Sequence, residues 1–152
     1  MSICILDTSV FANIVPVPTM QQDRQRVLAR LEDLIRDGVV LLLPMAAILE
    51  TGNHIADLAD GRLRRRTGAT FVQTVRDAIR GQAPFTPTPF IEAASLLRWL
   101  DEFPDSAMRG IGLADLSIIK EYERQCELHR GRRVFIWSLD AHLCGYDRPG
   151  TI

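Results

Sequence analysis

The chain has 152 residues and a formal net charge of −1, with 47% hydrophobic and 24% charged residues. This length and composition predict one globular domain, residues 1–152, and exclude wholesale disorder. The net charge excludes a polycation, so bulk attraction to nucleic acid cannot be argued from it.

The chain is expected to be a soluble, cytoplasmic protein. Its longest apolar run, residues 39–49, is interrupted by Pro44 and is too short to span a bilayer. Residues 3–6 follow Met1 without the basic segment that opens a signal peptide. The 3 cysteines are widely spaced, which is typical neither of a disulfide framework nor of a zinc site.

The first half of the chain alternates strands with helices. Residues 3–6 predict a short buried strand, and residues 39–43 are a continuous apolar run typical of a strand buried on both faces. Between them, apolar residues at helical spacing over 27–35 predict a helix that is closed by Gly38. Pro44 suits the first turn of a further helix, which is expected to run to about residue 60 and to end at Gly61.

The second half continues this alternation. Residues 83–89 carry 3 prolines and predict a loop with room for only a very short strand. A short helical turn is expected after residue 140. The remaining expected elements are a helix over 67–80, a helix from Pro89 that ends before Pro104, a helix from Leu113 to about Arg130, and a strand over 134–137. Strands that alternate with helices predict an α/β fold with a mostly parallel sheet.

Four acids from remote stretches are expected to meet at one edge of that sheet. Asp7 directly follows the first strand, and Asp140 lies just past the last clear strand. Glu50 lies in the second turn of a helix that follows a strand, and Asp115 lies in the first turn of another helix. Functional sites of parallel sheets lie at the carboxyl ends of the strands, where these positions would converge.

Convergent carboxylates raise one another's pKa unless a cation neutralises them. An oxygen-only ligand set suits Mg²⁺ or Mn²⁺ better than zinc. Two such ions about 4 Å apart can stabilise the attacking and leaving oxygens of a phosphodiester displacement. Three of the acids alone also have a structural explanation: Asp7 and Asp140 could cap turns or helices, and Asp115 could complement a helix dipole. Glu50 is less easily explained in this way, because its neighbours are not a solvated charge run. The combination of the four acids predicts metal-dependent hydrolysis of nucleic acid.

Four short segments surround these acids. They are Leu6-Asp7-Thr8-Ser9-Val10, Leu49-Glu50, Gly112-Leu113-Ala114-Asp115-Leu116-Ser117-Ile118-Ile119 and Ser138-Leu139-Asp140. In order, spacing and chain length they resemble the PIN-domain ribonucleases, particularly the VapC-type toxins of bacterial and archaeal toxin–antitoxin pairs. The resemblance covers essentially the whole chain. The first and third segments are fairly specific together, and the second is weak alone.

The resemblance implies a three-layer PIN-like fold and an endoribonuclease that cleaves single-stranded or loop RNA. Asp7, Glu50, Asp115 and Asp140 would hold one or two Mg²⁺ or Mn²⁺ ions, and a metal-activated water would leave a 3′-hydroxyl and a 5′-phosphate. The small polar residues Thr8, Ser9 and Ser138 would orient carboxylates, water or phosphate. The resemblance also implies a homodimer that is silenced by a small cognate antitoxin.

The chain departs from the family pattern in three places. It is longer than many such toxins, with the extra length around residues 62–89. His142 stands where an aromatic residue is common after the last acid. Little sequence follows Pro149, so the last strand of the usual sheet is expected to be short or absent.

Arginines cluster in the extra segment. Residues 62–80 carry six arginines against the single acid Asp77, a local net charge of +5. The group at Arg62, Arg64, Arg65 and Arg66 could steer RNA through its phosphates, or it could be a solvated helix start. Both interpretations stay open, as does a genomic preference for arginine codons.

Several other residues have both a functional and a structural interpretation. His54 shares a helical face with Glu50, where it could be a ligand, a proton shuttle or simply a paired polar group. Asn13 could contact substrate. The aromatic residues could stack on bases, although packing in a core or dimer is favoured for them: Phe71, Phe85, Phe90 and Trp99.

Three alternative functions compete with that of a metal-dependent nuclease. A haloacid-dehalogenase-type phosphatase needs a second Asp two positions after the first, where this chain has Ser9. A non-catalytic PIN-like module that binds RNA or protein would typically lack one or more of the four acids. Cleavage of DNA or structured RNA by the same site is not distinguished by the sequence.

Overall fold

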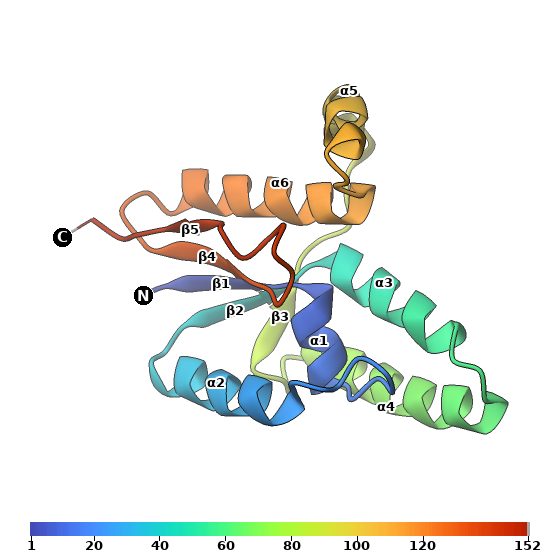
Figure 1. Ribbon diagram of the computed structural model, residues 1–152. Helices are drawn as coiled ribbons and strands as arrows, with labels where there is room; N and C mark the ends of the chain where they lie inside the picture. Colours follow the sequence, from blue (N-terminus) through green and yellow to red (C-terminus); the bar gives the residue numbers. More distant parts are fainter. Residues whose placement is uncertain (152) are drawn as a thin grey trace.

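A five-stranded sheet lies between helices in the computed structural model, which describes residues 1–151; Ile152, the end of the expected domain, lies outside them (Figure 1). The strands are β1 (Ile3–Leu6), β2 (Val40–Leu43), β3 (Phe85–Pro87), β4 (Val134–Trp137) and β5 (Asp147–Arg148). The helices are α1 (Thr8–Ile14), α2 (Arg24–Arg36), α3 (Met45–Ala56), α4 (Gly61–Ile79), α5 (Ala93–Met108) and α6 (Leu113–Leu128). No helix within residues 1–151 is both long and apolar enough to cross a membrane.

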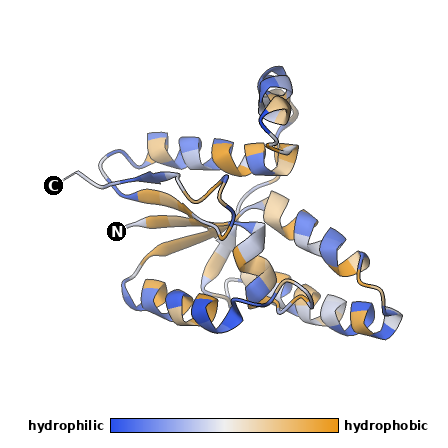
Figure 2. Ribbon diagram, viewed as in Figure 1, coloured by the Kyte–Doolittle hydropathy of each residue, from blue (hydrophilic) through white to orange (hydrophobic). Residues whose placement is uncertain are grey.

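The strand order is β3-β2-β1-β4-β5, with β5 alone antiparallel to its neighbour. In the central strand, Ile5 lies opposite Leu42 of β2 and Ile136 of β4. All four residues of β1 are buried. This burial on both faces explains why the sheet's central strands are continuous apolar segments (Figure 2).

The alternation of side chains along β1 divides the core into two clusters. Cys4 and Leu6 pack into the larger one, which α1, α2, α3 and α4 complete. Ile3 and Ile5 face the other side, where α6 and residues such as Leu143 cover the sheet. Helices therefore lie on both faces of the sheet, which confirms the expected three-layer α/β arrangement.

Most expected elements are present, and their boundaries follow local chemistry. Gly38 has a φ of 68°, the left-handed conformation of a glycine that closes a helix. The short strand in residues 83–89 is β3, and a hydrogen-bonded turn follows Asp140. The final strand is short, as expected. Its Arg148 guanidinium donates to the carbonyl oxygens of Cys126 and His129, which ties β5 to the end of α6.

The expected boundary at Gly61 is wrong. The helix after β2 stops at Ala56, and Gly61 begins α4 rather than ending α3. The Asp60 carboxylate accepts a 2.7 Å hydrogen bond from the backbone nitrogen of Leu63, so Asp60 caps a new helix. As a result, α4 starts six residues before the expected helix over 67–80 and includes the first arginine cluster.

The helix expected from Pro89 to Pro104 is displaced along the chain. It begins at Ala93 and continues through Pro104 to Met108. The proline ring removes only the hydrogen bond to the carbonyl of Leu100, and Pro104 is on the exposed side of α5, where water can replace that bond. In Figure 1 this helix stands away from the sheet, beyond the start of α6.

The chain also forms a helix that was not expected, α1. It follows β1 after one residue, and only seven residues separate Asp7 from Val15, its C-cap. Its short length and the prolines that follow obscure its periodicity in the sequence. The helix places residues directly after β1 at the carboxyl edge of the sheet.

Candidate active site

Three helices begin on the same side of the sheet, where the parallel strands end: α1, α3 and α6 (Figure 1). Asp7 caps α1, whereas α3 and α6 each carry one further acid singled out in the sequence, and the loop after β4 carries the fourth. This arrangement follows from the parallel order of β2, β1 and β4, because parallel strands end at a common edge.

Asp7 links the end of β1 to the beginning of α1. Its backbone nitrogen donates to the carbonyl of Trp137 at 3.0 Å, extending the β1–β4 pairing by one residue. Its side chain is the N-cap of α1 and accepts from the backbone nitrogen of Ser9 at 3.3 Å. Asp7 is only 3% exposed, so its carboxylate is held by protein groups instead of bulk water.

Two serine hydroxyls fix the same carboxylate. Ser9 Oγ and Ser138 Oγ each donate to Asp7 Oδ2 at 2.7 Å. Ser9 Oγ accepts in turn from the backbone nitrogen of Leu139 at 2.9 Å, and Ser138 Oγ accepts from that of Asp140 at 2.9 Å. These contacts hold the 138–140 segment against the end of β1, although the two lie at opposite ends of the chain.

Glu50 is joined to the first acid through Thr8. Thr8 Oγ1 donates to Glu50 Oε2 at 2.9 Å, which ties α3 to α1 across the site. Thr8 is buried, whereas the Glu50 side chain is 35% exposed. His54, one turn further along α3, has Nε2 3.8 Å from Glu50 Oε1, so the histidine lies beside the site.

Asp115 occupies the first turn of α6, where the charges of the other acids affect its pKa. Its pKa is raised from 3.8 to about 6, mainly by burial and then by the charges of Asp7, Glu50 and Asp140, in that order of importance. The nearby His142 acts in the opposite direction. The carboxylates are therefore close enough to repel one another across the site.

Asp140 is placed by its own turn. Its Oδ1 accepts from the backbone nitrogen of His142 at 2.9 Å, and its carbonyl accepts from the nitrogens of Leu143 and Cys144. The capping role considered for Asp140 is therefore present. It leaves Oδ2 without a protein hydrogen bond among the described residues.

The four carboxylates share one region without forming a compact ligand shell. Within residues 1–151, no three carboxylate, imidazole or thiol side chains are close enough to hold a metal ion. The groups whose charges reach Asp115 are three carboxylates and the imidazole of His142, and the hydroxyls of Thr8 and Ser9 donate to Glu50 and Asp7. Oxygen donors that repel one another match hard divalent cations in chemistry.

Asn13 has a structural role, contrary to the substrate contact considered for it. It is 2% exposed, and its amide nitrogen donates to the carbonyl of Ser9 at 2.8 Å. Its side-chain oxygen accepts from the backbone nitrogen of Asp23 at 3.1 Å. Asn13 thus joins α1 to the start of α2 and is almost wholly buried.

The four aromatic residues divide into two pairs. Phe71 and Phe85 both pack edge-on against Phe11, with centroid distances of 6.3 and 5.8 Å. Both contribute to the larger of the two core clusters. Phe90 and Trp99 instead line a groove of about 440 Å³ next to Glu50. No local sequence pattern indicates this groove, because its walls come from α3, α5, α6 and the 90–91 segment.

Neither a family model nor a curated protein sequence matches the chain. Among solved structures, the crystal structure of FitAcB from Neisseria gonorrhoeae is similar in fold, with a TM-score of 0.56 and 21% sequence identity. The similarity covers 90% of this chain and 87% of that chain. At this identity the comparison concerns the fold alone, and it confirms the expected PIN-like α/β fold with a mostly parallel sheet.

Proposed function

We propose that this protein is a divalent-metal-dependent endoribonuclease and the toxin of a toxin–antitoxin pair. The resemblance of its four acidic segments to VapC-type toxins and its PIN-like fold support this assignment. An RNA substrate and cysteines that are free within residues 1–151 fit a cytoplasmic protein.

One observation carries the proposal: a hydrogen-bonded chain connects acids that are remote in sequence. Glu50 is bonded to Thr8, the neighbouring Asp7 is bonded to Ser138, and Ser138 is bonded to the backbone of Asp140. Side chains that serve only to cap their own helices would not need bridges over 42 and 131 residues. The bridges hold acids from three elements in one orientation, as a preorganised site requires.

The donor set fits Mg²⁺ or Mn²⁺, with Asp7, Glu50, Asp115 and Asp140 as the ligands. When bound, such an ion would neutralise the carboxylates and act as a Lewis acid toward a phosphodiester. The protein's own contribution is orientation. Thr8 fixes Glu50, and Ser9 and Ser138 fix Asp7, so that the acids face the site despite their mutual repulsion.

The partners implied by the resemblance are a second copy of the chain and a cognate antitoxin. Apolar side chains on and beside α5 support a homodimer, because Leu97 is 66% and Met108 is 80% exposed. Burying such side chains between subunits is favourable. Light scattering of the purified chain, alone and with the protein encoded beside it, would test both partners.

RNA cleavage tests the proposed activity directly. End-labelled total RNA is incubated with purified protein and Mg²⁺, Mn²⁺ or EDTA, beside Asp7→Asn. Asparagine can still cap α1 and accept the serine hydroxyls, so this variant keeps the fold while losing the charge. We expect discrete fragments with 3′-hydroxyl and 5′-phosphate ends that vanish with EDTA and in the variant.

The same experiment distinguishes the non-catalytic alternative. If folded, antitoxin-free protein leaves a broad RNA pool intact with either metal, the nuclease assignment is wrong. RNA binding without cleavage would then identify a PIN-like binding module. Fragments that persist in both EDTA and Asp7→Asn would point to a contaminating nuclease and would not support the proposal.

A further inference from the structure

The exposed side of α4 carries a row of arginines that the proposed site does not use. Positions 62, 65, 66, 69, 73, 76 and 80 share one side of the helix, because all but the adjacent pair 65 and 66 are separated by three- or four-residue steps. All seven are exposed, and five are arginine. We call these five the α4 row: Arg62, Arg65, Arg66, Arg76 and Arg80.

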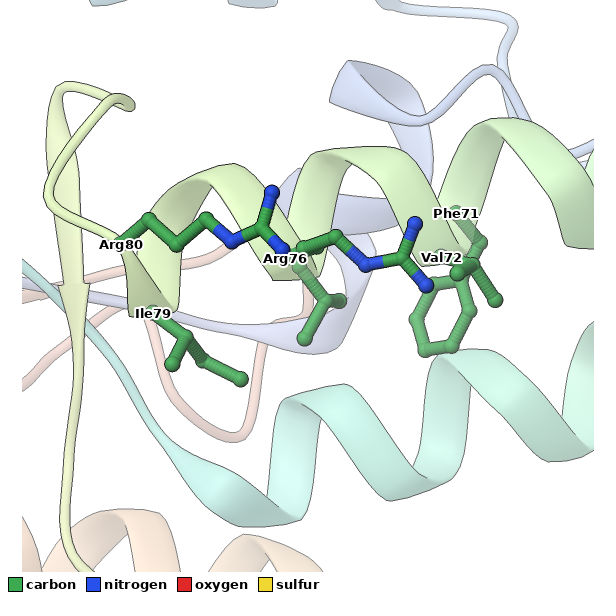
Figure 3. Close-up of a pocket in the computed structure, with 6 residues that line it drawn as sticks. Phe71, Val72, Arg76, Ile79 and Arg80 are labelled. Atoms are coloured by element: carbon green, nitrogen blue, oxygen red, sulfur yellow. The ribbon is translucent and has the colours of Figure 1, made fainter.

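Figure 3 shows part of this row. Arg76 and Arg80 extend along α4 in the same direction, and Ile79 and Phe71 point down from the helix; all four line one groove. Arg64 does not belong to the row, because its helical spacing puts it on the same face of α4 as Phe71 and Val75. The α4 row therefore includes arginines from both ends of the helix and leaves out Arg64.

The guanidinium groups of the α4 row have no internal partners. Elsewhere on the surface, Arg26, Arg36 and Arg133 each form a salt bridge with a carboxylate at 2.7–2.9 Å. Within residues 1–151, no arginine of the row forms a salt bridge or a side-chain hydrogen bond. The one acid on α4, Asp77, accepts instead from the neutral amide of Gln73 at 2.8 Å.

The row is fixed rigidly relative to the acidic site. Gly52, two residues after Glu50, faces the Phe71 ring. A Cβ at Gly52 would lie 3.8 Å from that ring, which is an ordinary van der Waals distance. Phe71 also packs on Phe11, four residues after Asp7. Both helices that carry these acids thus contact the inner side of α4. At its C-terminal end the row borders this side, because Arg76 and Arg80 line a groove of about 280 Å³ together with Phe71.

We propose that the α4 row binds the phosphate backbone of a single-stranded RNA whose neighbouring segment enters the acidic site. Five cations spaced over about 27 Å of helix match a polyanion of several nucleotides. Arginine forms bidentate contacts with phosphate, and unpaired arginines need not break a salt bridge to do so. This inference rests on the proposed ribonuclease function for the identity of the polyanion.

Salt dependence of RNA binding tests the row. A fluorescein-labelled oligouridylate is titrated in EDTA against protein carrying Asp7→Asn, and the anisotropy is measured over a range of KCl concentrations. Each lost phosphate contact should make the slope of log Kd against log salt shallower by about 0.7. Arg65→Gln with Arg76→Gln should therefore reduce it by about 1.4 in total.

The matched control removes the same charge elsewhere. Arg64→Gln with Arg109→Gln changes two exposed arginines outside the row and should alter the slope by less than half as much. Equal changes in the two double variants would overturn the inference in favour of net charge alone. A row variant that weakens binding of a polyaspartate peptide but not of RNA would overturn it in favour of an acidic protein partner.

Failure of the row and failure of the nuclease have different signatures. If the metal-loaded wild-type protein cleaves RNA and the row variant binds RNA with an unchanged salt slope, the row is wrong and the nuclease stands. If no protein cleaves RNA but Arg65→Gln with Arg76→Gln reduces the salt slope by the expected amount, RNA binding by the row is supported and the nuclease assignment is wrong.

Discussion

Ser138 Oγ lies 2.7 Å from Asp7 Oδ2 and donates a hydrogen bond to it across 131 residues of sequence. The same hydroxyl accepts from the backbone nitrogen of Asp140 at 2.9 Å. One small side chain thus sets the distance between the first and the last of the four candidate acids. Several consequences can be measured.

Ser138→Ala should reduce RNA cleavage by about 10- to 100-fold, the usual effect of losing a group that orients a metal ligand. Stability should change little, because Ser9 still donates to Asp7. Initial cleavage rates and thermal melts of the variant and wild type would check this. A matched Ser2→Ala change in the N-terminal segment should leave the rate unaltered, and a similar loss there would contradict the assignment.

Thr8→Val should lower activity by about 10- to 100-fold, since valine keeps the shape of threonine but cannot hold Glu50. Thr8→Ser retains the hydroxyl and should recover most of the activity. Cleavage assays at saturating Mn²⁺ would compare the two. Equal activity of the valine and serine variants would show that the 2.9 Å contact with Glu50 is not used.

Asp115 should make the metal-free protein less stable as the pH rises. Its folded pKa of about 6 exceeds the ordinary 3.8, so the folded state holds the proton more tightly. The resulting stabilisation is complete below the unfolded pKa and is lost as the pH rises through about 6. Asp115→Asn should make this pH-dependent decrease in the free energy of unfolding smaller by about 1 kcal/mol, a value that allows for solvent screening. Urea denaturation in EDTA on both sides of this window would measure it, and parallel pH profiles for variant and wild type would refute it.

Mg²⁺ or Mn²⁺ should stabilise the folded protein, because an ion relieves the repulsion among the four acids. A ligand at about 100 times its Kd adds about 2.7 kcal/mol to the free energy of unfolding. Thermal melts in EDTA and with each metal should show a rise of several degrees that shrinks in Asp7→Asn. The same rise in wild type and variant would place ion binding outside this site.

Asn13→Ala should destabilise the protein by about 1–3 kcal/mol, because it removes two part-buried hydrogen bonds, the one donated to the carbonyl of Ser9 and the one accepted from the backbone nitrogen of Asp23. Cleavage per folded molecule should stay close to that of wild type. Denaturant titration together with an activity assay below the melting temperature would separate the two effects. A large loss of activity at unchanged stability would restore the substrate role considered for Asn13.

The sheet and the acids could be predicted because both depend on local pattern. Buried parallel strands are continuous apolar runs, and an acid at the end of such a run must lie at the carboxyl edge. This pattern alone was enough to predict the positions of Asp7 and Asp140. The fold confirms the strands at 3–6 and 134–137, whereas the catalytic role of the acids stays a prediction.

The remaining features depend on contacts that no local pattern contains. Gly61 has the chemistry of both a helix end and a helix start, and only the Asp60 hydrogen bond to Leu63 decides between them. Thr8 and Glu50 are 42 residues apart, so their pairing follows from the packing of α1 against α3. The Phe90 and Trp99 groove likewise exists only once α5 stands beside α6.

Asp7 starts a helix with the same carboxylate that faces the candidate site. A descendant of this protein that lost its chemistry would still be under selection to keep Asp7, because α1 begins there. The presence of this aspartate in a distant homologue is therefore a poor indicator of an active enzyme. Glu50, which is 35% exposed and caps no helix, is the more informative position for separating active members of such a lineage from inactive ones.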